Sequence, residues 1–367
     1  MAETLKISTR QFTILATLIT IGDNILVLPA IPALEANRDA WISAIVGLVI
    51  GLIFVSLFVT AGKLNYKLSL IEHIREVFGR WVSIPIALLF IGYITLSISA
   101  HLREVGDFAV SQIMPDTPIE AVHILFLLLI IMGVRLGLET FTRVSEIFFP
   151  WFILLFIIFI VSLIPAIDLH KIQPVFDHGI KPILRGSIAC TAFPFLELVT
   201  LMMIFPNVNN EKDIRSGMMI GTLIGGMILV VFIGLTILVL GAEPAARNTY
   251  PSYDLAKRIN IGNFFQRVEA ILALMWIITT YFKMTLFSYV LHRSVAQLFQ
   301  LKDFRMLLFP IGMIIIFLSQ VIAPNIAYYN NFSSKYWPYM DLTFSMFFPL
   351  ALIVGYALRK NAHPKLR

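Results

Sequence analysis

Apolar segments long enough to cross a membrane alternate with short polar segments along almost the whole chain. A hydrocarbon core of about 30 Å needs roughly 20 residues of helix. On that length scale the pattern predicts ten transmembrane helices, near residues 11–34, 40–61, 81–113, 119–136, 147–166, 183–206, 216–241, 263–297, 305–323 and 338–358. Residues 1–367 are therefore predicted to form a single transmembrane domain of an all-α integral membrane protein.

Two connecting segments show helical spacing of their own. Residues 69–79 place apolar side chains at helical intervals and end in glycine, which predicts a short helix on the inner membrane surface. Residues 251–261 begin with proline and place Leu255 and Ile259 four residues apart. This spacing predicts a short outer helix that could cap a cavity.

Two spans carry helix-breaking residues at their middles, at corresponding places in the two halves of the chain. In the first span, Gly22-Asp23-Asn24 is followed by Pro29. In the sixth span, Gly186 is followed by the run 189–195, ACTAFPF. Backbone can leave the helix inside a bilayer only where protein or a polar cavity satisfies the freed groups. Matching interruptions indicate a small-solute site near the midplane of an inverted-repeat transporter fold.

The composition agrees with a chain that lies almost entirely in the bilayer. Apolar residues make up 58% of the sequence, charged residues make up 14%, and the mean hydropathy is +0.86. The first span is too long and too polar at its centre for a cleavable signal peptide. Cys190 is the only cysteine, which excludes an intrachain disulfide, and we expect it to be a small buried residue.

Basic residues are distributed unevenly between the two sides of the membrane. With the N-terminus in the cytoplasm, 17 of the 28 Lys and Arg residues fall on the inner side and nine on the outer side. The other two, Arg103 and Lys283, fall inside spans. This bias predicts that both termini are cytoplasmic, which requires an even number of spans. The net charge of +6 is thus a property of the loops and does not indicate nucleic-acid binding.

Enzyme motifs are absent from the sequence. It has no phosphate-binding glycine loop, no His-x-x-x-His metal spacing and no nucleophile elbow. The seven histidines are scattered and do not predict a metal site. We therefore expect neither catalysis nor a cofactor.

Six segments of the chain are specific enough to compare with known families. They are ISTRQFTILATLITIGDNILVLP, DAWIS, SLIEHIREVFGRW, TPIEAVHILFLLLIIMGVRLGLETFTRVSEIFFP, KPILRGSIACTAFPFLELVTLMMIFPNV and YPSYDLAKRINIGNFFQRVEAILALMWIITTYFK. Together they resemble the spore germination permeases, the B subunits of GerA-type germinant receptors, in the amino acid–polyamine–organocation superfamily. The resemblance covers essentially the whole chain.

This resemblance implies a LeuT-like five-plus-five inverted repeat, with repeats near residues 11–166 and 183–358 and with broken first and sixth helices. It also implies a pocket for a small-molecule germinant between those helices. Members of the family are nutrient sensors in the spore inner membrane that act with an A and a C subunit. The sequence departs from the family where Gly22-Asp23-Asn24 replaces an expected Gly-Thr-Gly-like step.

Three residues of the first break are predicted ligand contacts: Gly22, Asp23 and Asn24. An unpaired carboxylate at mid-membrane costs about 2.5–3.5 kcal/mol. Asp23 is therefore either a contact for a cation or amine, or a proton carrier, or else a capping carboxylate bonded to the local backbone. The N–H groups of the restarting helix would attract a ligand carboxylate.

The sixth span supplies four further predicted ligand contacts, which are Thr191, Phe193, Pro194 and Phe195. Glu197 follows the predicted break, and an intramembrane carboxylate is a functional candidate by default. We expect it to form a gating or structural ion pair with Lys283 of the eighth span, because neither charge is then alone in lipid. Direct ligand contact by Glu197 and snorkelling of Lys283 are the alternatives.

The third and eighth spans complete the predicted pocket. In the eighth span, which lines the pocket in this family, Ile277 and Tyr281 share a face and Thr280 lies beside them. In the third span, Tyr93 and Ser97 are again four residues apart, although a tyrosine packed in the interior is an equal alternative.

A polar patch follows further out in the third span and comprises His101, Arg103, Glu104 and Asp107. Arg103 and Asp107 stand four residues apart, so we expect them to pair in an outer vestibule. A proton relay is the alternative.

These features predict the membrane subunit of a spore germinant receptor that binds a small nutrient, with an amino acid as the expected class. Its partners would be the A and C subunits and the lipid bilayer, and not nucleic acid. Two rival functions share the fold, so the fold alone does not decide between them. They are a proton-coupled amino acid permease and a nutrient-gated ion channel subunit.

Overall fold

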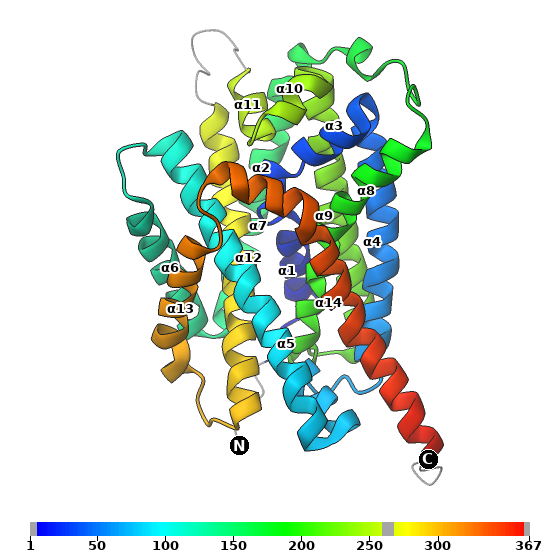
Figure 1. Cartoon of the computed structure of the whole chain (residues 1–367), viewed down its shortest axis with the longest axis vertical. Coiled ribbons are helices and arrows are strands. Elements are labelled where there is room, and N and C mark those ends of the chain that lie inside the picture. The colour runs from blue at the N-terminus through cyan, green and yellow to red at the C-terminus, as the bar shows by residue number, and fades with distance from the viewer. Residues whose placement is uncertain (1–5, 259–267, 363–367) are drawn as a thin grey trace.

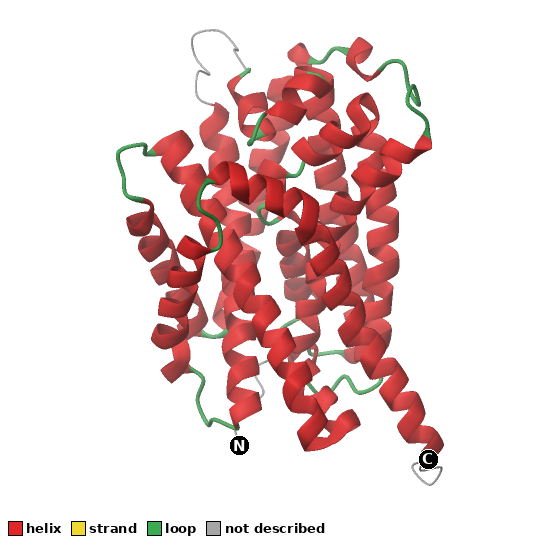
Figure 2. Cartoon of the chain, in the orientation of Figure 1, coloured by secondary structure: helices red, strands yellow, loops and turns green. Residues whose placement is uncertain are grey.

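Helices make up nearly the whole molecule (Figure 2). The computed structural model describes residues 6–258 and 268–362. Within these ranges the only β pairing is an isolated parallel bridge between Ile7 and Val208. The long helices run side by side, and the short helices α2, α3, α10 and α11 gather at one end (Figure 1).

A helix occupies each of the ten predicted spans. In chain order these are α1 (Thr9–Ile21) with α2 (Asn24–Val27) and α3 (Ala30–Ala36), α4 (Ala40–Gly62), α5 (Leu70–Phe108), α6 (Ile119–Leu136), α7 (Leu138–Leu163), α8 (Ile180–Phe195) with the 3-10 helix η5 (Leu196–Met203), α9 (Glu211–Leu240), α12 (Val268–Phe299), α13 (Leu308–Val321) and α14 (Ile326–Ala362).

Eight segments of the described chain are long and apolar enough, by length and composition, to cross a membrane. The other two predicted spans are shorter helices. The first is shortened because a break ends α1 after 13 residues. The ninth lies in the apolar segment Arg305–Val321. The tenth predicted span begins earlier than expected, since α14 starts at Ile326 and not near residue 338.

Both predicted surface helices have counterparts in the structure. Ser69 caps the first turn of α5 in a reciprocal capping box with Glu72, and Gly79 turns the chain at φ +75° before the transmembrane part begins. The predicted short helix at 69–79 is therefore confirmed. α11 (Pro251–Lys257) forms the start of the second one, whereas residues 259–261 lie outside the described ranges.

Two pairs of helices pack closely across the halves of the chain, α1 against α9 and α4 against α8. Glycine makes both approaches possible. A Cβ atom on Gly221 of α9 would lie 2.5 Å from the carbonyl oxygen of Thr13, and one on Gly47 of α4 would lie 2.6 Å from Cβ of Cys190. These glycines thus pack within the monomer. The first helix of each predicted repeat contacts the second helix of the other, as an inverted repeat requires. The repeat boundaries stay a prediction.

The sixth span is interrupted, but later than the sequence predicts. α8 is continuous from Ile180 to Phe195, so Gly186 and residues 189–193 are helical. The expected break at those residues is wrong, because an α-helix tolerates a buried glycine at modest cost. The change comes after Pro194, which lacks the N–H that would bond within the helix, and the chain continues as the eight-residue 3-10 helix η5.

Both ends of the chain lie at the same end of the molecule (Figure 1). This arrangement agrees with an even number of spans. We call this end the terminal end and the opposite one, which carries α2, α3, α10 and α11, the far end. The assignment of the terminal end to the cytoplasm stays a prediction.

Candidate functional site

The first span breaks at Gly22, between α1 and α2. Gly22 has φ +42°, and a Cβ atom there would lie 2.4 Å from Cδ of Lys283. Its carbonyl oxygen accepts a hydrogen bond of 2.6 Å from Thr279 Oγ1 of α12. The break therefore requires glycine twice, for its backbone angles and for the space that Lys283 occupies.

Lys283 joins the two interrupted spans. Its Nζ atom lies 2.6 Å from Asp23 Oδ1 at the first break and 2.5 Å from Glu197 Oε2 in the first turn of η5. His101 of α5 completes the cluster, since its Nε2 atom lies 3.3 Å from Asp23 Oδ1 and 3.7 Å from Glu197 Oε1. All four side chains are buried. We call Asp23, His101, Glu197 and Lys283 the charge cluster.

The cluster answers two questions that the sequence leaves open. Glu197 and Lys283 are in contact, as the sequence predicts, and Lys283 does not snorkel to a surface. Asp23 makes no capping bond to backbone within the described chain, because its carboxylate bonds to Lys283. Two carboxylates thus share one ammonium group in the low-dielectric interior, where removal of one partner of an ion pair is strongly destabilising. A gating role of the pair stays a prediction.

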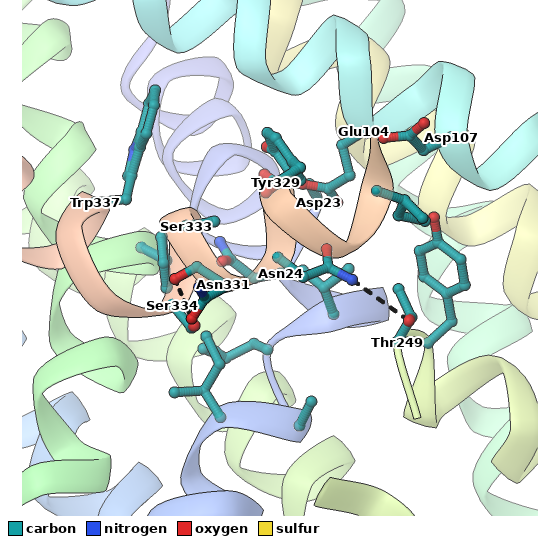
Figure 3. A pocket seen from close by; sticks show the side chains of 18 of the residues that line it. Asp23, Asn24, Glu104, Asp107, Thr249, Tyr329, Asn331, Ser333, Ser334 and Trp337 are labelled. Carbon is teal, nitrogen blue, oxygen red and sulfur yellow. Dashed lines mark hydrogen bonds between the residues drawn. The ribbon is translucent and has the colours of Figure 1, made fainter. Parts of the chain in front are cut away.

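A cavity of about 460 Å³ lies beside the charge cluster, and Asp23, His101 and Glu197 are part of its wall. Figure 3 shows Glu104 and Asp107 at one end of the view, and Trp337 and Ser334 at the other. The wall combines both interrupted spans, α3, the polar patch of α5, residues 246–250 and the first turns of α14. Its residues are Asp23, Asn24, Val27, Leu28, Ala30, Ile31, Leu34, Ala100, His101, Glu104, Asp107, Phe193, Glu197, Ala246–Tyr250, Ile326, Tyr329–Asn331, Ser333–Lys335 and Trp337.

Four of the predicted site residues line this cavity: Asp23, Asn24, Phe193 and Glu197. Gly22 and Lys283 lie beside it, at the break and in the charge cluster. The others do not line the cavity and bond or pack elsewhere. Tyr93 donates a hydrogen bond to Asp341, Ser97 bonds to the Tyr93 carbonyl, Thr191 bonds to the Ser187 carbonyl of its own helix, Pro194 and Thr280 are buried, and Phe195 packs where α4 and α9 have glycines.

The predicted face of α12 needs correction. Ile277 is 39% exposed, and Tyr281 places its hydroxyl next to Gly133 of α6. Thr279 and Lys283 are also four residues apart, and they are the ones that face the first break. A helix turns by about 100° per residue, so a correct i, i+4 spacing is compatible with several faces. Only packing selects between them.

The expected pair in the polar patch is confirmed. Arg103 Nε donates a hydrogen bond of 2.9 Å to Asp107 Oδ2, and a second guanidinium nitrogen donates to the Ala323 carbonyl at 2.7 Å. Nearby, burial and the carboxylates of Glu104 and Asp107 raise the pKa of the Tyr250 phenol.

Sequence reasoning missed the contribution of residues 326–337 to the wall. This stretch is rich in aromatic and polar residues, including Tyr329, Asn330 and Trp337, and it is too polar to resemble a membrane span. In the structure it forms the first turns of α14, and Asn330 bonds to Thr249 across the cavity rim at 3.4 Å. The clustering of amide and aromatic side chains in residues 326–337 was the sequence signal that could have predicted their place in the cavity wall.

Metal-binding geometry is not found among the described residues. No group of three or more His, Cys, Asp or Glu side chains there is arranged to hold a metal ion. The acidic groups of the cavity wall are instead paired with Lys283 and Arg103, with the exception of Glu104.

Comparison with known proteins gives a family match over most of the chain. The model of the family described as spore germination protein matches residues 6–327. Spore germination protein KB of Bacillus subtilis (strain 168) is 31% identical over 367 residues, which cover 99% of this chain and 98% of that protein. Spore germination protein A2 of the same organism is 26% identical and covers 81% of this chain and 82% of that protein.

Solved structures similar to this one are transporters of the LeuT-like fold. Mhp1, a nucleobase-cation-symport-1 family transporter in a closed conformation with bromovinylhydantoin bound, has a TM-score of 0.67 at 10% identity, covering 89% of this chain and 74% of that chain. MhsT in complex with L-phenylalanine has a TM-score of 0.63 at 12% identity, covering 95% and 97%. At such low identity these likenesses establish the fold alone.

Proposed function

Because the chain belongs to the spore germination protein family, we propose that it is the membrane subunit of a germinant receptor that binds a small nutrient in the cavity beside the charge cluster. The observation that carries this proposal is the composition of the cavity wall. Asp23 and Asn24 belong to the first interrupted span, and Phe193 and Glu197 belong to the sixth. A bound nutrient would thus contact both spans at once. An amino acid is the nutrient class we favour.

Binding at this place can transmit a signal if the nutrient favours one arrangement of the two spans. A ligand shifts a conformational equilibrium only by its difference in affinity for the two states. Glu197 lies in the first turn of η5, and a 3-10 segment inside a longer helix often marks a hinge. A nutrient that contacts Phe193 and Glu197 therefore binds at the start of η5, where a conformational change of η5 would alter its contacts directly.

The setting of this subunit is part of the proposal. Membership of the family supports the assignment of this chain as a multi-pass membrane protein. We propose that it lies in the spore inner membrane with both termini in the cytoplasm. The A and C subunits of the receptor would be its partners.

The proposal is tested with Phe193→Ala in spores that carry the intact receptor. Phe193 lines the cavity, whereas Phe309 of α13 lies outside it, is 61% exposed and supplies a matched control. We expect Phe193→Ala to lose nutrient-triggered germination while the subunit remains in the membrane, and Phe309→Ala to respond normally. Equal responses of the two variants would contradict the proposed site.

The two rival functions give different results in reconstituted vesicles. A proton-coupled permease would concentrate a labelled amino acid, and a channel subunit would pass current when the nutrient is added. We expect thermal stabilisation by the nutrient without concentrative uptake. Uptake that is lost in Phe193→Ala would favour the permease.

A further inference from the structure

We infer that Glu104 binds the protonated amine of the ligand, so that the cavity selects amine-bearing molecules over neutral or anionic ones of similar size. The inference rests on the proposed function, since it concerns the same cavity. It places the amine on Glu104 and not on Asp23, for which the sequence leaves an amine contact as one of several alternatives.

Glu104 is the one carboxylate of the cavity wall that has no ion pair within the described chain. Asp23 and Glu197 both contact Lys283, and Asp107 is held by Arg103. Glu104 lines the cavity with only 7% of its surface exposed, and its Oε1 atom accepts no hydrogen bond from any described residue. A buried polar atom without a partner is costly, and a ligand donor that reaches it recovers that cost.

Charge in the cavity favours a cation. Four carboxylates of the wall face two buried cations, Lys283 and Arg103, with His101 as the one further titratable base among them. The rim offers no buried cation to a ligand anion in the described residues, because Lys335 is exposed and Arg247 is paired with Glu243 at 2.6 Å. An ammonium group would neutralise excess negative charge, whereas an anion would add to it.

The helix ends at the cavity do not compensate with an anion site. The first turn of α14 is already capped, since the Tyr328 N–H donates a hydrogen bond of 2.9 Å to Asn325 Oδ1. α2 has four residues and α3 has seven, so neither provides the aligned peptide dipoles of a longer helix. The expectation that a ligand carboxylate docks on the restarting first helix therefore lacks support. The aromatic ring of Tyr329 lines the cavity on the side of Glu104 and suits an ammonium group, whereas Trp337 lies at the other end (Figure 3).

The test uses the full chain, purified in lipid nanodiscs, and measures thermal stabilisation by each standard L-amino acid. Every amino acid that stabilises the protein is then compared with its deamino analogue, for example L-leucine with 4-methylpentanoate and L-phenylalanine with 3-phenylpropanoate. D-glucose and myo-inositol serve as neutral probes of similar size. We expect stabilisation by the amino acid and none by its deamino analogue.

Three variants locate the effect. Glu104→Gln should weaken amino acid binding about ten- to a hundredfold, the range for loss of a hydrogen bond to a charged group. Glu104→Asp should retain part of the affinity, because it keeps the charge. Glu120→Gln makes the same change on an exposed residue outside the cavity and should bind as wild type.

The outcomes separate the inference from the proposed function. Equal binding of an amino acid and its deamino analogue, or stabilisation by a neutral polyol that Glu104→Gln leaves unchanged, would overturn the amine contact and leave the nutrient pocket standing. Unchanged amino acid affinity in Glu104→Gln would also overturn the amine contact without contradicting the nutrient pocket. If no probe stabilises the wild-type chain, both the pocket and the amine contact are wrong.

Discussion

The first and the sixth spans are interrupted in different ways. At the first break the α-helix stops, Gly22 adopts φ +42°, and its carbonyl oxygen bonds to Thr279 of another helix. In the sixth span the chain stays helical and only tightens into η5 after Phe195. Both interruptions have a tertiary partner, because Ser345 of α14 donates a hydrogen bond of 2.7 Å to the Leu196 carbonyl at the start of η5. The second interruption differs in that its chain also keeps the helical bonds of η5.

From this difference we infer that the first break is rigid and that the sixth span can change conformation at η5. The first break depends on α12 for both a hydrogen bond and a counter-ion, so we expect it to hold one geometry. η5 can exchange 3-10 for α-helical bonds without exposing its backbone, so we expect the sixth span to move when ligand binds. Lys283 contacts both interruptions and couples them.

The largest expected effect comes from Lys283→Met. The substitution leaves Asp23 and Glu197 buried without their cation, and we expect the free energy of unfolding to fall by about 3–5 kcal/mol. Thermal unfolding of the purified chain measures it, with Lys63→Met on the exposed end of α4 as the control. Adding Asp23→Asn and Glu197→Gln should recover most of the loss. A wild-type melting temperature for Lys283→Met would rule out the coupling.

Gly22→Ala should be the next most damaging change, at about 3 kcal/mol, because it strains the backbone and pushes against Lys283. Gly79→Ala is the matched control. Gly79 also has positive φ, but nothing lies within 4 Å of an added Cβ, so only the backbone strain of about 1–2 kcal/mol remains. The difference between the melting temperatures of the two variants measures the steric crowding at the first break. Equal losses of stability would show that the Lys283 side chain moves aside without cost.

Two threonines compare the hydrogen bonding of the two spans directly. Thr279→Val removes the donor to the Gly22 carbonyl and should cost about 1–3 kcal/mol. Thr191→Val removes a bond of 2.8 Å to the Ser187 carbonyl, which also serves α8, and a longer one of 3.4 Å to the Gly47 carbonyl of α4. This change should cost less than about 1 kcal/mol. Chemical denaturation of both variants gives the comparison. A larger loss of stability in Thr191→Val than in Thr279→Val would mean that the strained backbone lies in the sixth span.

The smallest effect on stability is expected for Pro194→Ala. Alanine restores an N–H in the last turn of α8, and the free energy of unfolding should change by less than about 1 kcal/mol. Hydrogen exchange of the η5 amides should nevertheless slow, because the helix can continue past Phe195. Pro349→Ala in α14 is the control that should leave η5 unchanged. Unaltered exchange in both variants would locate the hinge elsewhere.

Much of the architecture follows from residue types that act locally. The ten helices, the capped surface helix before Gly79 and the break at Gly22 were predictable, because hydrophobic length, capping and glycine or proline chemistry act over a few neighbouring residues. The pairing of Glu197 with Lys283 was predictable for a related reason, since two opposite charges in lipid have few other partners.

Other features required the third dimension. The spacing of Ile277 and Tyr281 is correct for one face of α12, but which face meets the first break is set by the rotation of that helix in the bundle. Asp23 joined the ion pair, and the polar turns of α14 closed over the cavity, only because segments far apart in sequence lie side by side. Local residue chemistry was enough to show which segments are helical and where a charge needs a partner, because short-range sterics and the high cost of an unpaired charge in lipid act on single segments. Which partner each group meets depends on the packed bundle, because several pairings satisfy the same local rules and the placement of distant helices selects one of them.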